Sequence, residues 1–168
     1  MYNLRDSNES CLRKKDHFCY MCSKVIFGNQ QTNFSENSKL LYTLYFGMQP
    51  QTHGSPFAPE FLCSTCSAYL RTWRTNDKML PFGQPAIWRD NSNHAADCFF
   101  CRTNIDGYNK SNKQNIHYAV VRSMDSPRPH SLRFPFPGPY NEVYARYTDQ
   151  QNRQNQLVQQ NQAVADLD

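Results

Sequence analysis

The cysteines are the residues of this chain best suited to chemistry, and most of them come in pairs. Cys11 stands alone, and the other six form three C-x-x-C pairs: Cys19/Cys22, Cys63/Cys66 and Cys98/Cys101. A C-x-x-C pair presents two thiolates to one zinc ion, and four thiolate or imidazole ligands complete a structural site. A disulfide framework would usually scatter its cysteines instead. The pattern therefore predicts zinc binding.

The first two pairs supply a complete set of ligands. Cys19, Cys22, Cys63 and Cys66 follow the spacing C-x2-C-x40-C-x2-C, so a long loop returns the second pair to the first. Four thiolates need no further ligand, and the set predicts one closed zinc site. A cross-braced arrangement would instead join the first pair to the third and the second pair to two histidines. The sequential pairing is the simpler of the two.

The third pair needs two more ligands. His94 precedes Cys98 with three intervening residues, so His94, Cys98 and Cys101 can converge on one point. The fourth ligand is His117, His130 or the lone Cys11. His117 lies in an alternating, strand-like stretch, whereas His130 follows a rigid Pro-Arg-Pro segment that would fix the direction of its ring. The residues alone leave this choice open.

A family resemblance favours one of these candidates. PFGQPAIWRDNSNHAADCFFC, followed by a loop and IHYAVVRSMDSPRPH, resembles a group of uncharacterised animal proteins, many associated with mobile elements. The resemblance covers residues 60–140 and implies that His94, Cys98, Cys101 and His130 hold the second ion, so we expect two zinc ions in the chain. Cys11 would then be a free thiol. The chain departs from the family pattern at AVVRSMDS, which replaces prolines and small residues, and the family implies no activity.

The N-terminal half carries a second resemblance. STCSAYLRTWR predicts a helix that begins at the second cysteine pair, because Cys66, Leu70 and Trp73 recur at helical spacing. This half contains a first C-x-x-C knuckle, a long insertion and a helix that begins at a second C-x-x-C. That order resembles the zinc-finger-associated domain of insect transcription factors. The resemblance covers residues 17–75. It implies a treble-clef fold and self-association.

Composition indicates a small fold held by metal. Hydrophobic residues make up 39% of the chain, which is low for a fold that depends on apolar burial alone. Residues 150–162 contain ten Gln or Asn in thirteen positions, which predicts disorder. We therefore expect a small, zinc-stabilised α+β fold with four parts: a flexible arm (1–16), a treble-clef-like zinc module (17–79), a second zinc module with an extended strap and a proline-rich segment (80–140), and a disordered tail (141–168).

Three connecting segments have recognisable patterns. Residues 80–90, LPFGQPAIWRD, predict an extended strap that ties the two zinc-centred halves together or binds a partner through its aromatic side chains. Residues 116–121 alternate and predict a strand. Residues 126–140 are rich in proline and aromatic residues, so they must be extended and either wrap their own domain or dock onto another.

No pattern in the sequence points to an enzyme. A catalytic zinc needs an open coordination position and a nearby acid or base, yet His94 is followed by Ala-Ala-Asp rather than by a glutamate two positions on. Asp97 is better placed to support an imidazole or cap a turn than to act as a general base. H-E-x-x-H and G-x-S-x-G motifs are missing. We expect no catalytic residue and no small-molecule substrate.

Two non-enzymatic functions remain. The first is a protein-interaction adaptor that uses the strap, the proline-rich segment and self-association. The alternative is binding of DNA or RNA, since residues 71–133 carry ten Lys or Arg against five Asp. Seven residues of that region could contact phosphates: Arg71, Arg74, Lys78, Arg89, Arg102, Lys110 and Lys113. No run of about twenty apolar residues occurs, so we expect an intracellular protein of the nucleus or cytoplasm, away from membranes.

Overall fold

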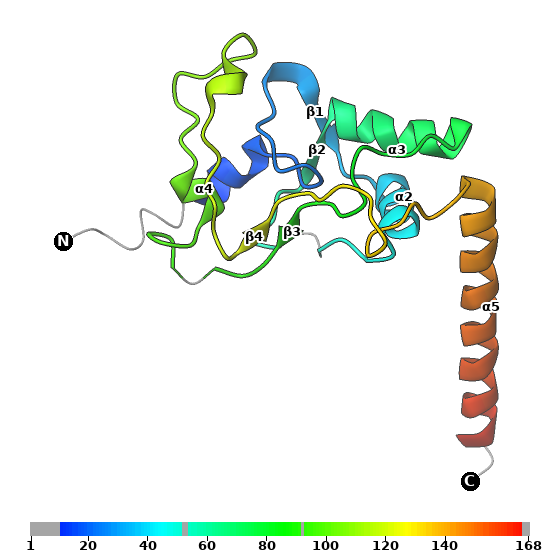
Figure 1. The fold of residues 1–168 in the computed structure, drawn as a ribbon. Helices are drawn as coiled ribbons and strands as arrows, with labels where there is room; N and C mark the ends of the chain where they lie inside the picture. The colour runs from blue at the N-terminus through cyan, green and yellow to red at the C-terminus, as the bar shows by residue number, and fades with distance from the viewer. Residues whose placement is uncertain (1–10, 52–53, 92, 166–168) are drawn as a thin grey trace.

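The chain folds around two small sheets and a set of helices of unequal length. The computed structural model describes residues 11–51, 54–91 and 93–165. The first ten residues of the predicted arm and residues 166–168 of the predicted tail lie outside that part. An elongated body carries α4 near one end and α3 near the other, and a long helix, α5, stands away from it (Figure 1). This is a small α+β fold, as the sequence predicts.

The N-terminal part of the body contains a two-stranded sheet, and a helix separates its two short strands in the sequence. β1 (Gln31–Asn33) runs antiparallel to β2 (Phe61–Cys63), with Thr32 opposite Leu62. Between them lies α2 (Glu36–Phe46), and α3 (Ser64–Asn76) follows β2 directly. Two 3-10 turns, η1 (Lys15–His17) and η2 (Gly28–Gln30), flank the first cysteine pair.

α2 and α3 have local signals at their ends. The hydroxyl of Ser35 accepts a hydrogen bond from the backbone N–H of Ser38 at the start of α2, and Gly47, with φ of 69°, ends the helix in the left-handed conformation. The helix predicted at the second cysteine pair is confirmed: α3 begins at Ser64, and it buries Leu70 and Trp73. α2 and α3 pack against each other.

The second part of the body has a two-stranded sheet of its own. β3 (Ile87–Trp88) runs antiparallel to β4 (Met124–Asp125), and the short helix α4 (Phe99–Arg102) and the 3-10 turn η3 (Lys113–Asn115) lie between them in sequence. The strand predicted at residues 116–121 is wrong: the segment has no strand partner among the described residues, and hydrogen bonds that involve side chains hold it instead. The Tyr118 hydroxyl accepts from the Val25 N–H, and the Ala119 N–H donates to the Thr103 hydroxyl.

The strap turns Trp88 inward and joins the two halves. Trp88 is buried, its indole N–H donates to the carbonyl of Tyr20 at 2.8 Å, and its ring stacks on Phe100. The Ala86 N–H donates to the carbonyl of Met21. Phe18, beside the first cysteine pair, packs on Phe100 as well. One apolar core therefore runs through both halves, and Trp88 is not available to a partner.

The proline-rich segment wraps its own domain. The indole N–H of Trp73 donates to the carbonyl of Gly138, and the ring of Phe136 lies 6.2 Å from that of Tyr45. The segment also crosses Gly83 of the strap at short range. A Cβ added at Gly83 would meet the Phe134 carbonyl oxygen at 2.4 Å and Nδ1 of His130 at 2.8 Å.

We therefore expect Gly83→Ala to destabilise the protein by about 1–3 kcal/mol, since an added methyl group must push the proline-rich segment away. Chemical denaturation monitored by tryptophan fluorescence would measure the change. Asp90→Ala, at an exposed position of the same strap, is the control and should change the free energy of unfolding by less than about 0.5 kcal/mol. Equal stability of the two variants would contradict the close approach.

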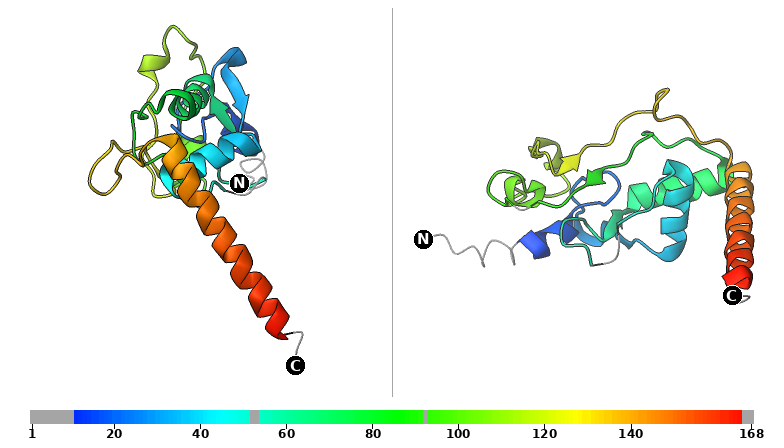
Figure 2. Two further views of the ribbon diagram at one scale, coloured as in Figure 1. Left: turned by 90° about the vertical axis from the view of Figure 1, so that its right-hand side faces the viewer. Right: turned by 90° about the horizontal axis from the view of Figure 1, so that it is seen from below.

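The predicted disordered tail is a helix over most of its length. α5 spans Tyr140–Ala165, and only its first turns touch the body (Figure 2). The carboxylate of Asp77 accepts a hydrogen bond from the Tyr140 N–H at 2.8 Å, and the Tyr140 ring packs edge-on against Trp73. These tertiary contacts offset the cost of nucleating the helix, and glutamine then continues it well. Composition contains no information about that anchor.

Candidate metal centres

Four thiols converge at the first candidate centre. The sulfur atoms of Cys19, Cys22, Cys63 and Cys66 all lie within 4.8 Å of one another. Cys22 and Cys63 approach to 3.9 Å between sulfurs, and Cys19 and Cys66 are buried. This is the set predicted from the sequence, joined in the sequential rather than the cross-braced pairing. Its arrangement suits a four-coordinate metal ion.

The first pair is held by a tight knuckle. The N–H of Cys19 donates to the carbonyl of Lys24, the N–H of Ser23 donates back to the carbonyl of Cys19, and Ser23 is left-handed with φ of 63°. Immediately after Cys19, the N–H of Tyr20 donates to the carbonyl of Phe61 at 2.8 Å. The knuckle is therefore fixed to the start of β2, which ends at Cys63 and leads directly into α3 with Cys66.

The second pair lies at the N-terminus of α3. The sulfur of Cys63 accepts a hydrogen bond from the Cys66 N–H, and the sulfur of Cys19 accepts one from the Cys63 N–H. A helix N-terminus favours negative charge, so this position suits thiolates. Hydrogen bonds from Cys19 and Cys22 hold the pKa of Cys63 far below the ordinary value for a thiol.

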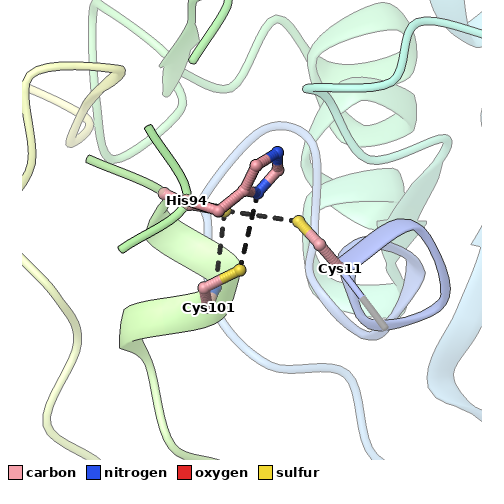
Figure 3. A group of neighbouring side chains, drawn as sticks. Cys11, His94 and Cys101 are labelled. Atoms are coloured by element: carbon pink, nitrogen blue, oxygen red, sulfur yellow. Dashed lines mark hydrogen bonds between the residues drawn. The ribbon is translucent and has the colours of Figure 1, made fainter. Parts of the chain in front are cut away.

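The second candidate centre joins residues that lie far apart in the sequence. Its members are Cys11, His94, Cys98 and Cys101, and their ligand atoms also lie within 4.8 Å of one another. The sulfurs of Cys11 and Cys98 are 3.3 Å apart, and the sulfur of Cys101 is 3.6 Å from Nδ1 of His94. Cys11 approaches from the blue N-terminal segment, and His94 and Cys101 approach from the green segment that contains α4 (Figure 3).

Local hydrogen bonds shape the loop that carries His94. The side-chain oxygen of Asn93 accepts from the N–H groups of Ala95 and Ala96, which closes a turn around His94. The carboxylate of Asp97 accepts from the N–H groups of Arg122 and Ser123, at 2.7 and 3.1 Å. Asp97 therefore fixes this loop to the turn before β4.

The two centres differ in their exposure to solvent. In the first, Cys22 and Cys63 are partly buried and the other two thiols are fully buried, whereas in the second Cys101 is exposed and His94 is half-buried. Cys98 is fully buried at the N-terminus of α4. A hydrogen bond from Cys11 lowers the pKa of Cys98 to about 4, so of these two residues Cys98 is the one that is present as a thiolate.

His130 does not reach either centre, which corrects the choice that the family resemblance implied. Its Nδ1 lies 3.1 Å from the carbonyl oxygen of Phe134, and its Nε2 lies 3.0 Å from both the Leu80 carbonyl oxygen and the Tyr45 hydroxyl. Both ring nitrogens are therefore engaged by the protein. His130 ties the proline-rich segment to α2 and the strap.

Cys11 takes the place assigned to His130, so the expectation of a free thiol on a flexible arm is also wrong. Residues 11–14 are helical and lead into η1, and Cys11 is only 3% exposed. His117, the other candidate, is exposed and outside both groups. One signal was available in the sequence: three ligands lacked a fourth while one cysteine was left over.

The seven basic residues considered for nucleic acid do not share one element or one environment. Arg71 and Arg74 are on α3 and Arg102 is on α4, near opposite ends of the body (Figure 1). Arg89 forms a 2.5 Å ion pair with Asp125, and Arg102 donates to the carbonyl of Ala95. Lys78, Lys110 and Lys113 are exposed in loops or turns.

Among the helices of the described residues, none is both long enough and apolar enough to cross a membrane. Comparison of the chain with protein-family models, with curated proteins and with solved structures gives no match. Within the described residues, the two clusters are compatible with the binding of structural metal ions.

Proposed function

We propose that this protein is a non-enzymatic, zinc-binding interaction adaptor, whose fold is stabilised by two structural zinc ions. The observation that carries the proposal is the pair of four-ligand clusters, each completed by side chains of the same chain. Eight ligands in two sets of four match the requirement of two tetrahedral ions. The metal would then decide whether the chain folds.

The type of ligand favours zinc. Thiolate and imidazole suit zinc, whereas magnesium and calcium prefer oxygen ligands. Iron–sulfur clusters are also held by four thiolates, but the second set includes His94. The first set lies between a knuckle and the N-terminus of α3, next to a small antiparallel sheet, and this order supports a treble-clef-like module.

The surroundings of the centres support a structural rather than a catalytic role. A catalytic zinc keeps one position open for water or substrate, whereas each cluster here offers four protein ligands. Asp97, the carboxylate next to Cys98, is occupied by two backbone N–H groups. Its hydrogen bonds fix a loop, so it is poorly placed to transfer protons.

A groove beside the first centre supports the adaptor role. It has a volume of about 530 Å³ and lies between the knuckle, α3, the strap and residues 113–118. Tyr69, Phe82 and Tyr118 provide aromatic walls, and Lys24 lies 4.2 Å from the centre of the Tyr118 ring. Such a surface suits apolar and aromatic side chains of a protein partner.

Zinc content is the direct test of the metal centres. Native mass spectrometry of protein purified without added metal should show two zinc ions per chain, and a strong chelator should unfold it, as monitored by circular dichroism. A chain that is folded without metal, or that contains iron instead, would contradict the proposal.

Nucleic-acid binding is tested separately, by fluorescence anisotropy with labelled single-stranded and duplex DNA and RNA. At physiological salt the adaptor proposal expects affinity no tighter than the nonspecific range of about 1–100 µM. Tighter binding that falls steeply with salt would favour the alternative function. The spread of the seven basic residues over the body gives that alternative no particular support.

A further inference from the structure

Most of α5 packs against no other part of the described residues. Every residue from 149 to 165 is exposed, whereas Val143 near the start of the helix is buried against the body. The free part stands well away from the body in both figures of the fold (Figures 1 and 2). Most of the stability of a helix in a protein comes from packing of one of its faces, and residues 149–165 have no such packing in the described structure. A second helix beside it would supply the missing stabilisation.

The large apolar residues of α5 lie on or beside one face, which they share with three amides in the free part. Positions separated alternately by four and three residues form a continuous stripe of the kind that joins two helices in a coiled coil: Val143, Tyr147, Gln150, Gln154, Leu157, Asn161 and Val164. Tyr144 and Val158 adjoin that stripe. The opposite face carries alanines, amides and a threonine: Ala145, Thr148, Asn152, Gln156, Gln159 and Ala163.

The stripe is used at one end and free at the other. Val143 and Tyr147 pack against the core of the body, while Leu157, Val158 and Val164 are 58%, 61% and 64% exposed. The face that binds the body therefore continues into solvent. Gln154 and Asn161 are the stripe positions on either side of Leu157, so in an antiparallel pair they face each other and their amides can hydrogen-bond.

We propose that the free part of α5 pairs with the same part of a second copy of this chain, in antiparallel orientation. The inference rests on the proposed interaction function and specifies one of its partners. The charge on this part permits a copy of itself: Asp149 and Arg153 cancel, so residues 149–165 are neutral and two copies do not repel each other.

The body already covers the start of the stripe, at Val143 and Tyr147, and this determines the orientation of the pair. In a parallel pair, the start of the second helix would occupy the face that already holds the body of the first copy. An antiparallel pair of the free parts avoids this overlap, and it places the two bodies at opposite ends of a helix pair about 26 Å long. Leu157 is the midpoint of residues 149–165, so the two copies of Leu157 meet at the symmetry axis.

Analytical ultracentrifugation of the full-length, zinc-loaded protein over a wide concentration range tests the proposal. Wild type should be in monomer–dimer equilibrium, and Leu157→Lys should raise the dissociation constant at least about tenfold, because it places two like charges at the axis and removes apolar burial. Gln156→Lys, which adds the same charge on the opposite face, should leave the dissociation constant within about twofold of wild type.

Zinc content is measured on the same samples, so failure of this inference is distinguishable from failure of the proposed function. A wild type that stays monomeric, or a dimer that Leu157→Lys does not weaken, would overturn the pairing through α5, even with two zinc ions bound. Small-angle X-ray scattering of the dimer tests the orientation. Two separated bodies are expected, and two bodies in contact would overturn the antiparallel arrangement.

Discussion

Replacing Cys11 by serine is expected to reduce the zinc content from two ions per chain to one. Cys11 is buried, and its sulfur lies 3.3 Å from that of Cys98 in the second cluster. Loss of a direct ligand should weaken that site by at least about 100-fold, because even residues that only orient ligands contribute 10–100-fold. Native mass spectrometry at low free zinc would show the loss, with the first site still occupied.

His130→Ala is the matched comparison for Cys11→Ser, because the sequence offered both residues as the fourth ligand. It should retain both zinc ions and lose about 1–3 kcal/mol of stability, since it removes hydrogen bonds to Leu80, Phe134 and Tyr45. Retention of two ions by Cys11→Ser, together with loss of one by His130→Ala, would show that the second centre is assembled differently.

Replacing Cys66 by serine is expected to prevent the chain from folding. Zinc sites of this kind contribute apparent free energies of about 10–16 kcal/mol in small peptides, and a whole domain is stable by only about 5–15 kcal/mol. Cys66 is 1% exposed and lies in the first turn of α3, where the helix meets the knuckle and β2. Loss of this site would leave three thiols facing one another within the core.

Cys101→Ser provides the control for Cys66→Ser, because each change affects the second cysteine of a C-x-x-C pair. Cys101 is exposed, so its loss should release the second zinc and leave a cooperatively folded protein with one ion. Circular dichroism and thermal unfolding would compare the two variants. Equal stability of Cys66→Ser and Cys101→Ser would contradict the dominant role of the first centre.

The two centres also suggest a hierarchy in the fold. The first joins the knuckle, β2 and α3, which lie in the continuous core, while the second attaches the segment around Cys11 to the loop of His94 and α4. Phe18 contacts Phe99 and Phe100, so apolar packing connects the halves independently of the second centre. We therefore expect loss of the second ion to release residues 11–14 before the core is affected.

The sequence by itself determined the parts of this protein that depend on local spacing. The three C-x-x-C pairs and the helix that begins at Ser64 follow from residues a few positions apart. The closed set of four thiols follows from joining the first two pairs in sequence order. The strap was predicted to join the halves, and Trp88 and Ala86 confirm that role. Metal-ligand spacing and helical periodicity are short-range properties, so they can be read along the chain.

Only the tertiary structure decided between Cys11 and His130. Cys11 and Cys98 are 87 residues apart, and no local pattern encodes the path that brings them together. The same holds for α5, whose first turn contacts Trp73 of α3 and Asp77, the residue at which α3 ends. Composition predicted disorder because it reflects only the apolar surface that a segment can bury by itself. Long-range contacts supplied the nucleus of the helix instead.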